Sequence, residues 1–376
     1  MATRVYDYIR SNAFSYPTLV FSLDNLSQNY NAFIDGLPGC NVHYAVKANP
    51  HRSILSRLVE LGGKFDAASA GEIETCLSVG ALPQHISFGN TVKRVQDIVY
   101  AHERGVDLFA VDSFEEIDKV STYAPGSRVF VRLLVNSTEA EWPLSRKFGC
   151  DASMVPFLMV YAKQRSLRPV GISFHVGSQT RHPHMWIGIL DSMSSVWKQC
   201  RSLGFDLHLL NVGGGFPSYY GTPITNSLDY NRTLDQYIKE RFDNVTYLMV
   251  EPGRGMVANL GSIAAEVLLV SKKSLDDETR WVYLNIGRFS GLAETEAEAI
   301  KYQLTVIGKE NHPTSGCILA GPTCDSADVM YEKHKVLLPV DLRAGDKVII
   351  NNTGAYTTTY SSIAFNGFPP LQVVEI

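Results

Sequence analysis

Two residues of this sequence stand directly at the ends of apolar runs and have side chains suited to covalent and acid–base chemistry. Lys47 follows NVHYAV (41–46), and a lysine amine withdrawn from water has a lowered pKa that favours condensation with a carbonyl group. Glu251 follows the apolar residues TYLMV in the run 246–253, where a carboxylate can hold a proton on a heterocyclic nitrogen. A solvent-reaching lysine and an internal Glu251–Arg254 ion pair are the structural alternatives.

A second group of residues has the composition of an anion site. Gly213, Gly214 and Gly215 follow an apolar run, and glycines let backbone N–H groups approach a phosphate closely. Ser178 in HVGS and Arg254 in EPGRG add a hydroxyl donor and a positive charge. Tight turns also use consecutive glycines, so the loop predicts a phosphate site only together with the serine and the arginine.

Further candidates stand at the ends of other apolar runs or in polar turns. His175 ends ISFHV and suits stacking or proton transfer, although a lone histidine is often a core residue. Cys324 and Asp325 share the turn GPTCDSAD (321–328), a setting typical of a reactive thiol. The remaining polar candidates are Asp66, Arg132 and Tyr356.

The elements that must position these residues alternate between short apolar runs and amphipathic stretches from about residue 40 to 255. Eight runs are found: 41–46, 64–69, 85–90, 106–112, 128–135, 169–176, 207–214 and 246–253. Eight such strands joined by helices predict a closed parallel (β/α)8 barrel, whose strand ends converge on one opening. An open doubly wound sheet is the competing fold, but it more often carries a glycine-rich turn after its first strand.

After about residue 262 the pattern changes to strand-like runs without long helical intervals. We expect an antiparallel β-domain there, to which TLVFSLD (18–24) adds a strand. The predicted organisation is therefore a barrel over residues 24–262 and a β-domain built from 1–23 and 263–376.

Composition narrows the classes of function. A net charge of −4 and a pI near 6.2 give no field that attracts nucleic acid or an anionic membrane, and no run of about eighteen apolar residues is present. The six cysteines lack paired spacing, so we expect free thiols and no structural metal site. Small-molecule chemistry in the cytoplasm, without nucleic acid or membrane, is the expectation.

Seven motifs taken in order resemble the fold-type III pyridoxal-phosphate decarboxylases, the group that includes bacterial ornithine and lysine/ornithine decarboxylases. They are HYAVKANP, FDAASAGEI, SFHVGSQ, NVGGGFP, EPGRGMVA, GPTCDSAD and GAYTTTYSS. This resemblance implies a barrel plus a β-domain, pyridoxal 5'-phosphate as cofactor, and decarboxylation of a basic amino acid.

The resemblance also implies a role for each candidate residue. Lys47 would carry the cofactor, His175 would stack on its ring, and Glu251 would face its ring nitrogen. Asp66, Glu72 and Arg132 would lie around the ring and the lysine. The phosphate would be held by Ser178, Gly214, Gly215, Arg254 and Tyr356.

In the family that the sequence resembles, the active site forms at a homodimer interface. Cys324 and Asp325 would then come from the partner subunit, with Cys324 returning a proton to Cα after CO2 leaves. Asp325 and Tyr356 would contact the substrate.

Substrate choice rests on a second carboxylate in SGLAETEAEAIKY (290–302). Glu298 is expected to supply it, with Glu296 and Glu294 as rivals, and the distal amine of ornithine or lysine would be its partner. Bacterial relatives commonly have Met-Asp where this chain has Glu296-Ala297, which makes lysine or a longer amine more plausible. The products would be putrescine from ornithine and cadaverine from lysine.

Several alternatives remain at this stage. Decarboxylation of arginine or diaminopimelate is one, although Asp325 stands where the diaminopimelate branch usually has Glu. A racemase is another, but racemases usually place Arg against the ring nitrogen, where this chain has Glu251. The third is a non-catalytic cofactor-binding homologue of the antizyme-inhibitor kind, against which Lys47 and Cys324 speak.

Overall fold

The computed structural model describes residues 3–135 and 147–376. The chain divides into two compact units, and each is described by itself. The barrel unit comprises Ser27–Pro217 and Ile224–Met256, and the β unit comprises Met1–Leu26, Ser218–Pro223 and Val257–Ile376.

The barrel unit is built on a closed ring of parallel strands, which confirms the predicted barrel over the open sheet. The ring closes because the first strand pairs with both the second and the last. Its strands are β2 (Asn41–Ala45), β3 (Lys64–Ala67), β4 (Ile86–Phe88), β5 (Leu108–Val111), β6 (Arg128–Arg132), β7 (Arg168–Ser173), β8 (Leu209–Asn211) and β9 (Tyr247–Val250).

These segments form strands because both of their faces are buried, which selects continuous apolar runs. Phe65, Phe88, Phe109 and Phe130 are all almost completely buried within them. Each observed strand is shorter than the run that predicted it, because the polar end of the run leaves the ring as a loop. The candidate residue His175, for example, lies two residues beyond the end of β7.

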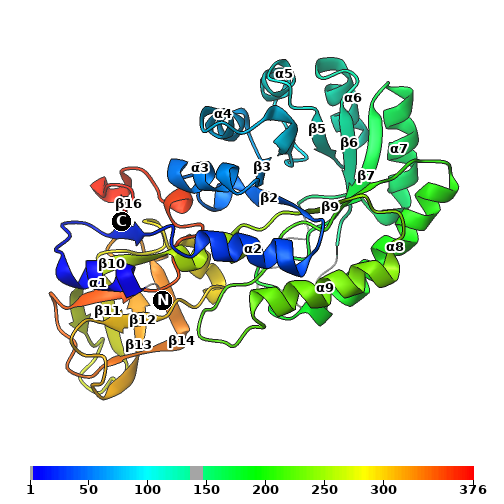
Figure 1. Cartoon of the computed structure of the whole chain (residues 1–376). Coiled ribbons are helices and arrows are strands. Elements are labelled where there is room, and N and C mark those ends of the chain that lie inside the picture. The colour runs from blue at the N-terminus through cyan, green and yellow to red at the C-terminus, as the bar shows by residue number, and fades with distance from the viewer. Residues whose placement is uncertain (1–2, 136–146) are drawn as a thin grey trace. The chain divides into compact units, whose positions relative to one another are not determined.

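Helices surround the ring of strands in the barrel unit (Figure 1). Ser69 and Ser113 begin two of them as N-caps, each accepting a hydrogen bond from a backbone N–H three residues on. The helices are α2 (Leu26–Gly36), α3 (Arg52–Glu60), α4 (Ala70–Ser78), α5 (Val95–Glu103), α6 (Phe114–Tyr123), α7 (Val155–Gln164), α8 (Ile187–Ser202), α9 (Ser227–Arg241) and α10 (Arg254–Val257).

The β unit is a mixed sheet, so the prediction of a purely antiparallel domain was wrong in two pairings. β1 pairs with β16 in parallel, and β11 pairs with β13 in parallel. Alternation of apolar residues identifies a strand but not the direction of its partner. The strands are β1 (Thr18–Phe21), β10 (Gly261–Ser271), β11 (Arg280–Leu284), β12 (Leu304–Val306), β13 (Thr314–Ala320), β14 (Val329–Pro339), β15 (Lys347–Ile350) and β16 (Gln372–Glu375).

Two elements of the β unit were not predicted. Helix α1 (Thr3–Ser11) buries Val5 and Ile9 against the sheet, and β14 is an eleven-residue strand. Residues 332–335 of β14 are polar and exposed, so their sequence resembles that of a loop.

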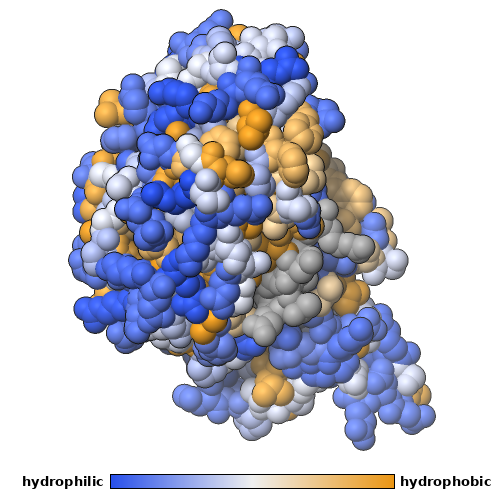
Figure 2. Space-filling view, turned by 90° about the vertical axis from the view of Figure 1, so that its right-hand side faces the viewer, coloured by the Kyte–Doolittle hydropathy of each residue, from blue (hydrophilic) through white to orange (hydrophobic). Residues whose placement is uncertain are grey.

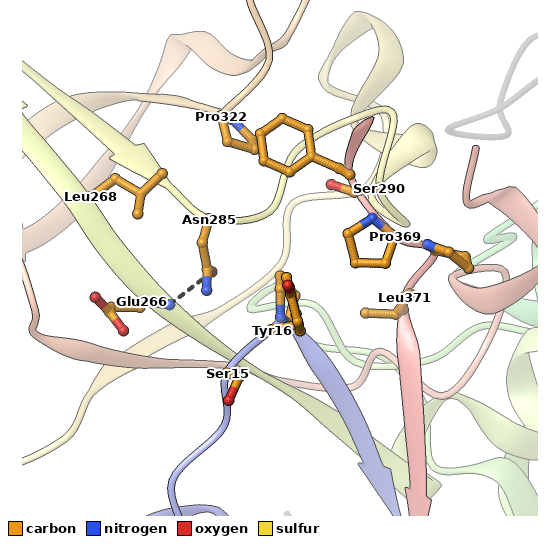
Figure 3. Close-up of a pocket in the computed structure, with 12 residues that line it drawn as sticks. Ser15, Tyr16, Glu266, Leu268, Asn285, Ser290, Pro322, Pro369 and Leu371 are labelled. Carbon is orange, nitrogen blue, oxygen red and sulfur yellow. Dashed lines mark hydrogen bonds between the residues drawn. The ribbon is translucent and has the colours of Figure 1, made fainter. Parts of the chain in front are cut away.

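A pocket of about 250 Å³ lies in the β unit between its N-terminal and C-terminal segments (Figure 3). Tyr16 lies just before β1 and Leu371 just before β16, and the N–H of Glu266 donates to Oδ1 of Asn285 at one side (2.9 Å). None of the predicted site residues lines this pocket.

The described part of the chain contains no helix that is both long and apolar enough to cross a membrane. On the face drawn in Figure 2, hydrophilic residues predominate and apolar side chains occur in small groups.

Candidate active site

Lys47 stands at the rim of the barrel, where β2 turns into a short 3-10 helix, Val46–Ala48. The flanking residues Val46 and Ala48 are buried, so the turn is fixed while the lysine side chain is exposed. Withdrawal of Lys47 from water is therefore not provided within the single chain and stays a prediction. The amine is accessible to a carbonyl compound from solution.

Asp66 lies in β3, next to the strand that leads to Lys47. Its side chain is buried, and Oδ1 has no hydrogen-bond partner among the residues that the structure describes. Burial raises the pKa of Asp66 well above its usual range, and the neighbouring Glu251 raises it further. Lys47 and Arg132 act in the opposite direction, so these four residues lie within electrostatic reach of one another.

Glu72 is fixed by two hydrogen bonds at the start of α4, in an arrangement that resembles a capping box. Ser69 Oγ accepts from the N–H of Glu72 (3.3 Å), and Glu72 Oε2 accepts from the N–H of Ala68 (2.7 Å). Burial raises the pKa of Glu72. The hydrogen bond from the N–H of Ala68 and the electrostatic effect of Lys47 lower it. Glu72 thus stabilises the start of α4 and is also one of the charged residues around Lys47.

His175 follows β7 and is half-buried at the same rim. Its Nδ1 accepts a hydrogen bond from the N–H of Gly177 (3.0 Å). Burial, Arg132 and Lys47 hold the pKa of His175 well below its usual range. The neutral ring therefore carries its proton on Nε2, the nitrogen that faces Gly214.

Glu251 follows β9 directly, and its carboxylate is held by a residue that the sequence analysis missed. Asn211, the last residue of β8, is fully buried and donates from Nδ2 to Oε1 of Glu251 (2.5 Å). Its Oδ1 accepts from the N–H of Gly213 (2.8 Å). Asn211 directly precedes the predicted glycine loop, and that position was the signal that could have found it.

The glycine loop after β8 is packed so closely that side chains do not fit. A Cβ at Gly214 would lie 2.7 Å from the carbonyl oxygen of Glu251, and one at Gly215, where φ is +105°, would lie 2.4 Å from that of Gly177. The N–H groups of Gly214 and Gly215 have no hydrogen-bond partner within the described ranges.

Arg254 and Ser178 lie together in the barrel unit. The guanidinium of Arg254 is buried and donates to Ser178 Oγ (3.1 Å). A buried cation, a hydroxyl group and the two available N–H groups of the glycine loop form a donor set that suits a phosphate. Together with the Lys47 amine and the Glu251 carboxylate, these groups fit the polar ends of pyridoxal phosphate.

The remaining candidates belong to the β unit. Cys324 and Asp325 are exposed in the turn between β13 and β14, and the N–H of Cys324 donates to Asn366 Oδ1 (3.0 Å). Oδ1 of Asp325 accepts from the N–H of Ala327 (2.8 Å). Tyr356 follows β15 and is half-buried, with φ of +55°.

A second residue that the sequence analysis missed holds the Cys324 turn in shape. Asp328 is buried, and its carboxylate accepts from the N–H of Arg288 (2.8 Å) and from the N–H and Oγ1–H of Thr323 (3.1 and 2.8 Å). A Cβ at Gly287 or Gly321 would lie within 2.5 Å of these oxygens. The aspartate that ends the motif GPTCDSAD was the available signal.

Glu298 has a structural task that the sequence analysis did not predict. Its carboxylate accepts from three successive backbone N–H groups of β14, those of Glu332 (2.8 Å), Lys333 (2.6 Å) and His334 (2.9 Å). These hydrogen bonds lower the pKa of Glu298. Glu298 therefore has a structural role, and because a carboxylate has about four acceptor positions, its contact with the distal amine stays a prediction. The rival Glu296 forms an ion pair with Arg288.

The cysteines fall into two classes. Burial raises the pKa of the thiols of Cys40 and Cys150 to about 12 and of Cys200 and Cys317 to about 11, and it also raises that of Cys76. Cys324 is the exposed one, and all six thiols are free. Within residues 3–135 and 147–376, no cluster of His, Cys, Asp or Glu is arranged to hold a metal ion.

Comparison with known proteins gives the family. Residues 23–258 match the model of the pyridoxal-dependent decarboxylase, pyridoxal binding domain. The chain is 32% identical to ornithine decarboxylase of Schizosaccharomyces pombe (90% of this chain, 78% of that protein) and 33% identical to antizyme inhibitor 2 of Xenopus laevis (93% and 78%). Its structure matches lysine/ornithine decarboxylase of Vibrio vulnificus complexed with cadaverine, with a TM-score of 0.87 at 30% identity (100% and 99%).

The chain belongs to the pyridoxal-dependent decarboxylase family. The predicted family, the predicted barrel with a separate β-domain, and pyridoxal phosphate as cofactor are confirmed.

Proposed function

We propose that this protein decarboxylates a basic amino acid, converting L-ornithine to putrescine and L-lysine to cadaverine. The observation that carries the proposal is the convergence of Lys47, the Glu251 carboxylate and the glycine loop at one rim of the barrel. The substrates named for the Schizosaccharomyces and Vibrio relatives support the choice of a diamino acid.

Each residue at the rim would have a different role in binding the cofactor. Lys47 would carry the cofactor, Arg254, Ser178, Gly214 and Gly215 would hold its phosphate, and Tyr356 would add to that site. Glu251 would hold a proton on the ring nitrogen, and His175 would lie against the ring as a neutral imidazole. When bound, pyridoxal phosphate supplies a sink for the electron pair that is released as CO2 leaves.

The reaction consumes one proton, because the carboxylate on Cα is replaced by hydrogen. We assign delivery of that proton to the Cys324 thiol, which is exposed and held by the hydrogen bond of its N–H group to Asn366. Asp325 would pair with the distal ammonium group through Oδ2, which has no hydrogen-bond partner in the described part of the chain.

We further propose that the active enzyme is a homodimer in which Cys324 and Asp325 complete the partner's site. Lys47 is exposed in the single chain and needs a covering surface to exclude water. Exposed apolar side chains follow Tyr356 in the chain, with Ile363 84% and Tyr360 50% exposed and Phe365 and Phe368 each 37%. Such a group beside Cys324 is typical of a protein interface.

Mixing two inactive variants tests the shared site. Lys47→Ala and Cys324→Ala chains, combined after subunit exchange, should recover about a quarter of wild-type activity, since half of the dimers are mixed and each has one complete site. Recovery of no activity from a mixture that forms mixed dimers contradicts a site shared between subunits.

The substrate proposal is tested by measuring CO2 release from ornithine, lysine, arginine and diaminopimelate with added pyridoxal phosphate. Turnover of ornithine or lysine with the highest kcat/KM is the expected result. Preference for arginine or diaminopimelate reassigns the substrate, and no turnover of any of the four rejects the proposed activity.

A second candidate function is favoured by the similarity to antizyme inhibitor 2 of Xenopus laevis. In that case the protein would act by binding a partner and would not turn over amino acids. The exposed Cys324 thiol and the Asn211–Glu251 contact support the enzyme, because a regulator does not need a proton donor or a fixed carboxylate. The substrate assay separates the two candidates.

We place the protein in the cytoplasm, where reduced thiols persist. Six free cysteines support this location. Cell fractionation is the test, and recovery from an extracellular or periplasmic fraction contradicts it.

A further inference from the structure

The amide of Asn211 joins two parts of the site that would contact opposite ends of the cofactor. Nδ2 donates to Oε1 of Glu251 (2.5 Å), and Oδ1 accepts from the N–H of Gly213 (2.8 Å). The two contacts determine the orientation of the amide, because the NH2 group can only donate and the oxygen can only accept. One rigid side chain therefore connects the carboxylate to the glycine loop.

The backbone around Asn211 holds this side chain in place. Asn211 ends β8 in register with Met249 of β9, and its carbonyl oxygen accepts from the N–H of Phe174 (3.2 Å). The N–H of Glu251 donates to the carbonyl oxygen of Gly213 (2.8 Å), which closes a ring of contacts with the side chain. With its side chain fully buried, Asn211 has no route to solvent, so a bound substrate would not reach it.

The site contains two carboxyl groups close enough to influence each other, Asp66 and Glu251. Burial and Glu251 raise the pKa of Asp66, whereas Lys47 and Arg132 lower it. Two neighbouring carboxyl groups cannot both be charged without cost. The N–H donor of Asn211 points to Glu251 and not to Asp66, and a donor of this kind stabilises a carboxylate in its charged form.

We propose that Asn211 is a positioning residue that selects Glu251 as the charged carboxylate of the pair and fixes it relative to the glycine loop. Asp66 is then the carboxyl group that takes up the proton. This inference rests on the proposed role of Glu251 toward the ring nitrogen of the cofactor.

Cofactor affinity and absorbance of the dimeric protein test the inference without an activity assay. Asn211→Leu removes both hydrogen bonds and should raise the Kd for pyridoxal phosphate about tenfold to a hundredfold, the loss expected for one hydrogen bond to a charged group. The absorbance band of the bound cofactor should become dependent on pH in the variant and remain constant in the wild type. Asn211→Ser is the milder replacement should the leucine variant not fold.

Asn231→Ala is the matched control. Asn231 is also a buried asparagine of the barrel unit, but its Nδ2 donates to the carbonyl oxygen of Ala32 (2.9 Å). Its replacement should leave the Kd and the absorbance unchanged. Equal changes in the two variants show that only general packing was lost, and they overturn the inference.

A double-mutant cycle shows whether Asn211 acts through Glu251. In a Glu251→Ala background, Asn211→Leu should raise the Kd less than about threefold, because the acceptor is already absent. Full additivity of the two changes overturns the inference. If the wild type itself does not bind pyridoxal phosphate, the proposed function is wrong. If the wild type binds it and the Asn211→Leu variant binds it equally well, only the inference about Asn211 is wrong.

Discussion

The backbone N–H of Gly177 donates a hydrogen bond to Nδ1 of His175 over 3.0 Å, which leaves Nε2 as the nitrogen that carries the proton. The ring is neutral because burial, Arg132 and Lys47 all lower the pKa of His175. A neutral ring can lie against a cofactor without adding a positive charge to that of Lys47.

A stability measurement follows from this lowered pKa. The unfolded chain takes up a proton at His175 near pH 6.5 and the folded chain does not, so acid favours unfolding. His175 should lower the free energy of unfolding of the apoprotein by up to about 1.4 kcal/mol for each pH unit below about 6.5, with no effect above it. Urea unfolding of wild type and His175→Gln at pH 7.5 and 5.5 measures this. A difference between the two proteins that does not change with pH contradicts the assignment.

Close packing beside Asp66 gives the second prediction. A Cβ at Gly89 would lie 1.9 Å from Asp66 Oδ1, so Gly89→Ala must displace the carboxyl group. We expect a loss of about 1–3 kcal/mol in the free energy of unfolding and weaker cofactor binding. Gly188→Ala is the control, because a Cβ there meets no atom within 4 Å apart from the backbone of its own helix. This replacement in helix α8 should not lower the free energy of unfolding. Equal free energies of unfolding for Gly89→Ala and Gly188→Ala would contradict this prediction, because the Asp66 carboxyl group would then be displaced without loss of stability.

The barrel could be predicted from sequence because each of its strands is buried on both faces and therefore appears as an apolar run. The β unit could be predicted only in part. β14 carries exposed charges at residues 332–335, and its partner β13 cannot be identified from periodicity. The parallel pairing of β1 with β16 joins the two ends of the chain, and no local pattern encodes that contact.

Glu298 leads to the third prediction. Glu298→Gln leaves one oxygen for the N–H groups of β14 and turns an NH2 group toward the N–H of His334. The unsatisfied donor should lower the free energy of unfolding by about 1–3 kcal/mol, and loss of the negative charge should raise the KM for diamino acids. Glu296→Gln is the control, because Glu296 is mostly exposed and its ion pair with Arg288 should contribute little. Unchanged stability would contradict the structural role of Glu298, and an unchanged KM would contradict its contact with the distal amine.

The turn that carries Cys324 gives the fourth prediction. Asp328→Asn removes one of the two acceptors that hold Thr323 and the N–H of Arg288, so the thiol should lose its fixed position. We expect kcat to fall about tenfold while the Kd for pyridoxal phosphate is unchanged. Asp341→Asn, an exposed carboxylate of the same unit, should leave both constants unaltered. A fall in cofactor affinity without a change in kcat contradicts this role of Asp328.

In the candidate site, too, residues with a local sequence signal could be predicted, whereas residues that act through distant contacts could not. Lys47, His175 and Glu251 could be predicted because each ends or follows an apolar run, and the ends of parallel strands share one rim. Asn211 and Asp328 act through hydrogen bonds to residues of other loops, which depend on the folded backbone. The hydrogen bonds of Glu298 to β14 could not be predicted, because β14 was not recognised as a strand.

Borohydride trapping measures directly whether the cofactor is attached covalently to Lys47. The protein is incubated with pyridoxal phosphate, reduced with sodium borohydride and digested, and the labelled peptide is identified by mass spectrometry, with Lys47→Ala as the control. We expect a single labelled peptide that contains Lys47 and no label in the variant. Label on another lysine, or none on wild-type protein, would contradict it.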